Sequence, residues 1–474
     1  MTEADWTSVL PPLFAIGLAI VSRQVILSLL AGIWLGYGLV GSGNPFTALA
    51  EGLDGIVAVL ADAGDARVIG FALVIGALIA VMEHTGGVRG FVAWLTGRQW
   101  VDGPKRAQWL AWWVGIVVFI ESNLTLLVAG AISRPLFDRF RLSRERLAYL
   151  IDATSAPICI LIPLNAWGAF NLGLLGGTAV DDPLGTFLAS IPMNLYAIAA
   201  VILAALSIHF DLLPGPMRAA EERTRGGTLL WPGASPMVDP AVMATDDAEG
   251  DPARARFMVW PIVLLVLAVP AGLWITGDGD LTAGSGSTSV LWAVCAGLTL
   301  AWILALAAGE RMDTLMNTSL RGAGALLPVA VILLLALALG DVTGLLGTGP
   351  YLAQVISDAF PVFVLPALVF VVAAFTAFSI GSSWGTFAIT IPIAVPMALD
   401  LGQAPALYLA AALSGGVFGD HASPISDTTV VASMAAATDH IDHVRTQLPY
   451  ALIAGAVAGT GFLLLGLLLP APGS

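Results

Sequence analysis

A series of long apolar segments constrains this chain more than any other feature of its sequence. The segments lie near residues 9–22, 24–42, 68–83, 107–133, 147–174, 184–210, 257–276, 288–308, 322–340, 362–399, 404–437 and 447–470. A run of about 20 apolar residues is long enough for a helix to cross a bilayer. Since 58% of the residues are hydrophobic and only 11% are charged, the chain has too few charges to cover a soluble surface. The alternation of a transmembrane barrel is absent. The sequence therefore predicts an all-α polytopic membrane protein.

The charge balance and the cysteines exclude further classes of protein. The chain carries 33 acidic and 19 basic residues, a net charge of −14, which is unfavourable for binding nucleic acid or an anionic surface. Cys159 and Cys295 both lie in apolar segments. We interpret them as small core residues, because free cysteine behaves as a small hydrophobe.

One long polar segment, residues 211–256, interrupts the apolar pattern. It is rich in glycine, proline and charge, which is typical of a connecting segment. We predict a cytoplasmic linker here, between an N-terminal transmembrane half at 1–210 and a C-terminal half at 257–474. Each half is expected to hold one hairpin and one broken helix.

The basic residues predict the orientation of the loops. They cluster in residues 85–106, 134–146, 211–256 and 309–321, whereas the loops near 175–183 and 277–287 contain none. The positive-inside rule assigns the first group to the cytoplasm and the second to the outside. Segment 46–62 is apolar but carries three acidic residues. Whether it crosses the membrane is left open.

This orientation requires two segments to turn back within the membrane. A single crossing by 107–133 would separate two basic loops, so we predict a re-entrant hairpin with a polar tip at Phe119–Thr125. Residues 362–399 are too long for one crossing and contain a Gly/Ser break at 378–386, which predicts a second hairpin from the other side. Small polar residues and proline follow each hairpin, at Asp152–Pro157 and Asp420–Pro424. The pattern is typical of an inverted-repeat transporter with two re-entrant hairpins and two broken transmembrane helices.

Four acidic residues lie inside apolar segments, namely Glu121, Asp152, Asp420 and Asp427. An ionisable group at the bilayer centre costs ~2.5–3.5 kcal/mol on translocon scales, so a fold retains it only with a partner or a function. A position at a helix end, within the interface, is the alternative, and it is most plausible for Asp152. The four carboxylates are therefore the first candidates for an ion pathway.

The segment from Asp420 to Thr429 is the densest group of polar residues. Pro424 frees a backbone carbonyl, and serine and threonine hydroxyls surround two carboxylates. Such hard oxygen ligands suit sodium, which we place at Asp420, Ser423, Ser426 and Asp427. His421 can carry a proton near neutral pH. A Ser/Pro helix kink with capping side chains is the alternative.

The other candidate ion or substrate ligands lie at the hairpin tips and helix breaks. They are Glu121, Ser122, Asn123, Asp152, Thr154, Ser155, Asn165, Ser382, Ser383, Trp384, Thr386, His421 and Thr428. Tight helix packing is the alternative for the small residues among them.

A further cluster, close to the predicted cytoplasmic side, is expected to form an ion-paired gate or a pH sensor. It consists of Asp439, His440, Asp442, His443 and Arg445. A transition-metal site is the weaker alternative, because the spacing matches no zinc motif.

Several of these motifs resemble one family. The segments concerned are 418–429, 439–450, 134–163, 382–386 and 391–396. They are similar to the NhaC family of sodium/proton antiporters, which also includes sodium-coupled malate/lactate exchangers. The resemblance implies a secondary transporter of the ion-transporter superfamily in a bacterial or archaeal cytoplasmic membrane. It also implies a homodimer, and no cofactor other than sodium as coupling ion.

One departure from the family pattern leaves the cargo open. Family members commonly carry an acidic pair after the phenylalanine at the first hairpin, whereas this chain has Glu121 alone. Sodium/proton antiport by alternating access is the first hypothesis. Exchange of a small organic ion, a carboxylate or an amino-acid-like molecule, on the same scaffold is the second. The third is an intramembrane metal-dependent hydrolase using the His/Asp cluster, and we expect that the protein is not an enzyme.

Overall fold

The computed structural model shows a helical chain, with no strand in the part that it describes. That part comprises residues 5–22, 24–41, 44–96, 101–119, 122–163, 165–236, 251–279, 284–348, 351, 355, 360–424 and 426–469.

In the part that the structure describes, the N-terminal half forms fourteen α- and 3₁₀-helices, and the start of the linker forms α13. Their bounds are η1 Trp6–Val9, α1 Leu10–Ser22, α2 Val25–Val40, α3 Pro45–Val59, α4 Ala63–His84, α5 Gly87–Thr96, α6 Pro104–Val117, α7 Ser122–Arg139, α8 Arg144–Asp152, α9 Ala156–Leu161, α10 Ala166–Gly176, α11 Pro183–Ser190, η2 Ile191–Met193 and α12 Leu195–Phe210, followed by α13 Gly215–Arg225.

The rest of the chain follows the predicted order of apolar segments. Its elements are η3 Pro252–Ala255, α15 Arg256–Thr276, α16 Gly286–Ala307, α17 Met312–Ala325, α18 Leu327–Leu345, η4 Val362–Val364, α20 Leu365–Ile380, α21 Ser383–Asp400, α22 Pro405–Ala422, α23 Asp427–Ala436 and α24 His440–Leu468.

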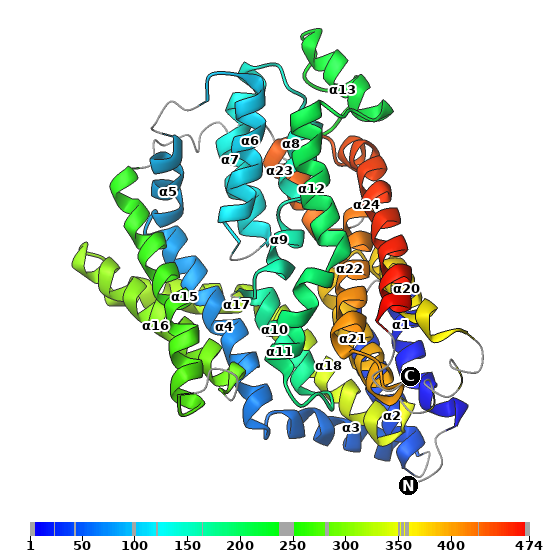
Figure 1. Ribbon diagram of the computed structural model, residues 1–474. Coiled ribbons are helices and arrows are strands. Elements are labelled where there is room, and N and C mark those ends of the chain that lie inside the picture. Colours follow the sequence, from blue (N-terminus) through cyan, green and yellow to red (C-terminus); the bar gives the residue numbers. More distant parts are fainter. Residues whose placement is uncertain are drawn as a thin grey trace.

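The helices have the length and composition of membrane crossings. Among the described residues, five are long and apolar enough to span a bilayer, or up to nine if each bent pair counts as one span. Exposed leucine, valine, isoleucine, phenylalanine and tryptophan side chains cover the outside of the bundle. The protein is therefore a multi-pass membrane protein. The undecided segment 46–62 forms α3, which turns by 115° from α2 and runs across the bottom of the bundle in Figure 1.

The two predicted hairpins and the two broken helices are present. α6 and α7 form the first hairpin, and α8 and α9 form the interrupted helix that follows it. In the second half, α20 and α21 form the hairpin, and α22 and α23 form the interrupted helix.

The two hairpins open toward opposite ends of the bundle, as Figure 1 shows. At the upper end, Lys105 at the start of α6 donates to the carbonyl of His209 at the end of α12 (3.0 Å). Arg144, at the start of α8, donates to the carbonyl of Ala437 just after α23 (3.0 Å). We call this the arginine-rich end, because the predicted basic loops lie here.

Three stretches that the sequence predicts as loops contain helices. α5, α13 and α17 occupy much of the predicted loops 85–106, 211–256 and 309–321. Hydropathy does not detect such helices, because they are polar or short and owe their stability to packing against neighbours. In α13, for example, Met217, Ala220 and Thr224 are buried on one face.

Residues 211–235 form a strap across the arginine-rich end. The carboxylate of Glu145, which is 0% exposed, accepts two hydrogen bonds from the guanidinium of Arg223 (2.7 and 3.0 Å). Arg223 also lies over the ring of Trp231, 4.8 Å from its centroid. Glu145 lies in the first turn of α8, so the strap is attached directly to the helix that carries Asp152.

Two further contacts fix the strap in place. The buried carboxylate of Glu221 accepts from the backbone N–H and the hydroxyl of Ser143, the N-cap of α8 (3.0 and 2.8 Å). The N–H of Ser235 donates to the carboxylate of Asp439, the N-cap of α24 (2.9 Å). The strap therefore connects the ends of α8 and α24.

We predict that Arg223→Ala destabilises the protein strongly, because Glu145 would stay buried without its cation. Loss of one partner from a buried ion pair costs about 3–5 kcal/mol. Thermal unfolding in detergent should show a large drop in Tm, and the double variant with Glu145→Gln should recover part of it. Arg225→Ala is the matched control, since the Arg225 side chain is 57% exposed. Equal Tm values for Arg223→Ala and Arg225→Ala would contradict this account.

Candidate functional site

The two helix breaks lie at the centre of the bundle and have the same local cause. Ser155 donates from its hydroxyl to the carbonyl of Asp152 (3.0 Å), and Pro157 lies in the first turn of α9, where no N–H is needed. In the second break, Ser423 donates to the carbonyl of Phe378 (2.7 Å), and Ser426 caps α23 by accepting from the N–H of Thr429 (3.2 Å). Hydroxyls thus replace the backbone hydrogen bonds that an interrupted helix loses.

Glycines allow each hairpin to approach its broken helix closely. A β-carbon on Gly115 of α6 would collide with the hydroxyl of Thr154 in the first break. A β-carbon on Gly419 of α22 would collide with the carbonyl oxygen of Ala374 in α20. Small residues at such crossings bring backbones together in membrane proteins.

Asp152, the last residue of α8, is completely buried. Its Oδ2 accepts from the amide of Gln447 (2.7 Å) and from the hydroxyl of Thr429 (3.3 Å). Among the described residues its Oδ1 has no hydrogen-bond partner, and it lies 3.8 Å from Nε2 of His421. The carboxylate is therefore only half satisfied. None of the Asp152 side chain is exposed, so its charge is shielded from solvent by the protein itself.

Asp420, near the end of α22, has the same arrangement. It is completely buried, and its Oδ2 accepts from the hydroxyls of Ser383 (2.8 Å) and Thr428 (3.2 Å). Its Oδ1 is also without a hydrogen-bond partner in the part of the chain that the structure describes. Since Ser383 is the first residue of α21, this carboxylate connects the tip of the second hairpin to the second break.

His421 lies between these carboxylates and a small cavity. Its Nδ1 is 3.2 Å from the hydroxyl of Tyr196, and its Nε2 has no hydrogen-bond partner. The cavity, of about 10 Å³, is lined by residues that include His421, Gln447, Tyr149, Tyr196 and Tyr450. This is close to the volume that one water molecule requires.

The first hairpin is connected to the first break through Asn165. Its amide donates to the carbonyls of Phe119 (3.1 Å) and Cys159 (2.8 Å), and its oxygen caps α10 at Gly168 (2.9 Å). Ser122, in the first turn of α7, is buried. The predicted ligand Glu121 lies outside the described residues, as do the side chains of Asn123 and Asp427.

The tip of the second hairpin is a tight turn beside an aromatic group. Gly381 adopts a φ of +74°, which a glycine tolerates without strain, and its N–H donates to Ala377 (2.7 Å). Ser382 is the N-cap of α21, and Thr386 donates to its carbonyl (2.9 Å). Trp384 contacts Trp167 of α10, with ring centroids 4.8 Å apart. These predicted residues therefore shape the turn, and Ser383 is the one that reaches a carboxylate.

The predicted gate cluster divides into a buried and an exposed part. His440 and His443 are buried and both lie near the hydroxyl of Ser433 (3.0 and 2.9 Å from their Nδ1 atoms). His443 contacts Gln447 through Nε2 (3.0 Å), so a hydrogen-bonded path runs from the histidines to Asp152. Asp439 caps α24, Asp442 is partly exposed and Arg445 is exposed.

Several residues of the site were missed by the sequence reasoning. They are Gln447, Ser433, Tyr196 and Asn171. Gln447 could have been predicted from its spacing, since it lies four residues after His443 and therefore on the same polar face of α24. Tyr196 has no such signal, because its hydroxyl meets His421 from a helix 225 residues away in sequence.

Two polar groups on α10 are buried without partners. The indole Nε1 of Trp167 and both amide atoms of Asn171 make no hydrogen bond to the residues that the structure describes, and both side chains are at most 1% exposed. Spaced four residues apart, they lie on one face of the helix. Among the described residues, no group of three or more His, Cys, Asp or Glu is arranged to hold a metal ion.

Comparison with known proteins assigns this architecture to a family. A model of the Na⁺/H⁺ antiporter family matches residues 175–467. The chain belongs to the Na⁺/H⁺ antiporter family. An uncharacterised protein of Haemophilus influenzae is 32% identical to it over 97% of this chain and 90% of the relative.

Two other antiporters match shorter stretches of this chain. The arginine/ornithine antiporter ArcD of Halobacterium salinarum is 33% identical over 34% of this chain and 32% of that protein. The malate-2H⁺/Na⁺-lactate antiporter of Bacillus subtilis is 36% identical over 18% of each chain.

Solved structures share the fold at low sequence identity. The YdaH transporter of Alcanivorax borkumensis matches with a TM-score of 0.59 and 14% identity, over 88% of this chain and 89% of that one. MtrF of Neisseria gonorrhoeae matches with a TM-score of 0.51 and 15% identity, over 90% and 86% of the two chains. The family and the fold together identify a secondary transporter of the antiporter type.

Proposed function

We propose that this protein is a sodium/proton antiporter of the NhaC type, in which Asp152 and Asp420 bind Na⁺ and H⁺ alternately. The observation that supports the proposal is a pair of completely buried carboxylates, each with one oxygen that lacks a hydrogen-bond partner. An uncompensated buried charge costs several kcal/mol, so each carboxylate requires a proton or a cation.

The chemistry around the two carboxylates suits sodium. Hydroxyl, carbonyl and carboxylate oxygens surround the breaks, and hard cations prefer such ligands. Ser423 donates to the carbonyl of Phe378 and Ser426 accepts from the N–H of Thr429, so both hydroxyls lie within the second break, close to Asp420 in sequence. The proposed sodium ligands remain Asp420, Ser423, Ser426 and Asp427, with Asp152 added from the other half.

Alternating access follows from the opposite directions of the hairpins. The second hairpin packs on its own broken helix, whereas α7 of the first hairpin packs on α8 and also on α23, where Gly130 meets Ala435. We propose that movements of the hairpins against these helices open one end of the bundle at a time. We propose that the two halves form an inverted repeat around the carboxylates, and that the protein works as a homodimer in a prokaryotic cytoplasmic membrane.

His440 and His443 are proposed as the pH sensor of this transporter. Gln447 donates to Asp152, so its oxygen must accept from Nε2–H of His443. The single hydroxyl proton of Ser433 then faces three acceptors, at Thr429 and the two Nδ1 atoms. A proton on Nδ1 of either histidine would supply a further donor to the hydroxyl of Ser433, and this geometry is what supports the pair as the sensor.

The proposal is tested by sodium-driven proton flux in proteoliposomes that contain a pH-sensitive dye. The wild type should change the internal pH when Na⁺ is added, and Asp152→Asn and Asp420→Asn should fall to the background of empty liposomes. Ser383→Ala should raise the KM for Na⁺ about 5–10-fold, because it removes one hydrogen bond to a charged group. Asp182→Asn, at the exposed N-cap of α11, is the control. Absence of Na⁺-dependent flux in the wild type would overturn the proposal.

The proposal also predicts how the apparent KM for Na⁺ depends on pH. Protons compete with Na⁺ for the same carboxylates, so the apparent KM for Na⁺ should rise as the pH falls, by up to about tenfold per unit for one competing proton. His443→Gln should shift the pH at which the flux is half maximal while retaining Na⁺ dependence. An unchanged profile in His443→Gln would remove the sensor from the proposal.

Exchange of a small organic ion is the second candidate function. It is favoured by the unpaired polar atoms of Trp167 and Asn171, next to the aromatic side chains of Trp384 and Phe170. Buried groups without partners are unusual in native proteins and are explained by a ligand or by water. The names of the two partial relatives, which concern amino acids and carboxylates, agree with this class of cargo.

We predict that Asn171→Leu and Trp167→Phe distinguish the two functions. If the cargo is organic, both variants should lose counterflow of labelled carboxylates and amino acids but keep their thermal stability. If the cargo is Na⁺ and H⁺ alone, both variants should keep dye-detected flux, and removing an unsatisfied buried group should leave Tm unchanged or raise it. No counterflow by the wild type across a broad metabolite panel would eliminate the second candidate.

A further inference from the structure

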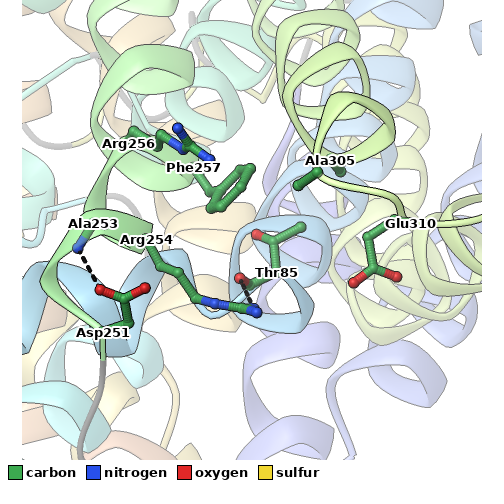
Figure 2. Close-up of a pocket in the computed structure, with 9 residues that line it drawn as sticks. Thr85, Asp251, Ala253, Arg254, Arg256, Phe257, Ala305 and Glu310 are labelled. Carbon is green, nitrogen blue, oxygen red and sulfur yellow. Dashed lines mark hydrogen bonds between the residues drawn. The ribbon is translucent and has the colours of Figure 1, made fainter.

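A polar cavity lies away from the carboxylates, at the arginine-rich end of the bundle. It has a volume of about 260 Å³ and lies between the end of α4, the start of α15 and the end of α16. The side chains shown in Figure 2 come from all three places: Thr85, Asp251, Arg254, Arg256, Phe257 and Glu310. A single water needs only about 10–15 Å³ by this measure, so the cavity has room for a small polar group.

The two arginines of the cavity are not paired with carboxylates. Arg254 extends toward Thr85 in Figure 2 and donates one hydrogen bond to its carbonyl (3.0 Å). The guanidinium of Arg256 lies over the ring of Phe257, 5.0 Å from the centroid. Across the described part of the chain, neither arginine forms an ion pair. Most of their ten N–H donors, five on each guanidinium, are therefore available to a ligand.

The two carboxylates of the cavity contact groups other than the arginines. Asp251 uses one oxygen to accept from the N–H of Ala253 (2.9 Å), as the N-cap of η3. Glu310 lies 3.4 Å from Nε2 of His84, a partially exposed pair. In the described part of the chain, the cavity thus contains two arginines and two carboxylates that form no ion pair with each other.

A ligand that carries both charges complements this arrangement. Guanidinium groups bind phosphate oxygens through charge-assisted hydrogen bonds, and carboxylates bind a primary ammonium. The cavity lies at the ends of the membrane spans α4, α15 and α16, the level at which lipid headgroups meet the protein. We propose that it binds the headgroup of a zwitterionic phospholipid with a primary amine, with the phosphodiester at Arg254 and Arg256 and the ammonium at Glu310 and Asp251.

The site does not depend on the transport function proposed above. None of its residues touches Asp152 or Asp420 in the contacts described, and its helices form the part of the bundle around α4 and α16. A headgroup bound here would join α15 to the ends of α4 and α16, and so would stabilise that part of the bundle.

Thermal unfolding of the delipidated, detergent-solubilised protein tests the proposal. Mixed micelles that contain phosphatidylethanolamine should raise Tm more than micelles with phosphatidylcholine, which lacks N–H donors, or phosphatidylglycerol, which lacks the ammonium. Arg256→Gln and Glu310→Gln should each weaken the apparent affinity for phosphatidylethanolamine about tenfold, the effect of losing one charge-assisted hydrogen bond. Arg311→Gln should leave it unchanged, because that side chain is 82% exposed and outside the cavity.

Several outcomes would overturn the proposal. Equal stabilisation by the three lipids would do so, as would an unchanged preference in both Arg256→Gln and Glu310→Gln. Free phosphoethanolamine that is as effective as the lipid at equal concentration would show a soluble ligand instead of a lipid. Arg254 is left out of the main comparison because it also supports the carbonyl of Thr85. Each variant serves as its own reference, since the preference is a difference between lipids in the same protein.

Discussion

Two carboxylates buried at the centre of a membrane-embedded bundle are the constraint on which the rest of the site depends. Asp152 and Asp420 are 0% exposed, and each has one satisfied and one unsatisfied oxygen. A continuous helix would offer these groups no hydroxyls and no free backbone. The breaks between α8 and α9 and between α22 and α23 provide both, because serine, threonine and proline interrupt the helices there. The local sequence is therefore explained by the need to keep a charge in a place that disfavours it.

The hairpins transmit this constraint to the two ends of the bundle. Ser383, at the tip of the second hairpin, donates to Asp420, whereas Asn165 connects the tip of the first hairpin to the first break. At the arginine-rich end, the strap holds the start of α8 through Glu145 and Ser143. The charge state of the carboxylates and the positions of both ends are thus connected through a few short hydrogen bonds.

Much of the fold could be predicted from the sequence, because a chain in a lipid bilayer can satisfy its backbone hydrogen bonds in only a few kinds of structure. The hairpins were predicted from segment length and from the side assigned to the basic loops, and the breaks from proline beside serine and threonine. The helices α5, α13 and α17 were not predicted, since tertiary contacts stabilise them and a hydropathy profile carries no information on such contacts.

The site was predictable only in part for a similar reason. Asp152, Asp420, His421 and Ser383 were found because each is a polar residue in an apolar or Gly-rich context. Gln447 and Tyr196 escaped, because their role depends on which distant helix they face. Contacts between residues about 200 or more positions apart are set by the packing of the bundle, which one sequence does not reveal.

The central claim is that sodium and protons compete for the same buried carboxylates, and proton release on sodium binding tests it most directly. Adding NaCl to the purified, weakly buffered protein should release protons, whereas choline chloride at equal ionic strength should release none. The release should disappear in the double variant Asp152→Asn/Asp420→Asn, because neither side chain then holds an exchangeable proton. Absence of Na⁺-specific release from the wild type between about pH 6 and pH 9, or an unchanged release from the double variant, would contradict the account.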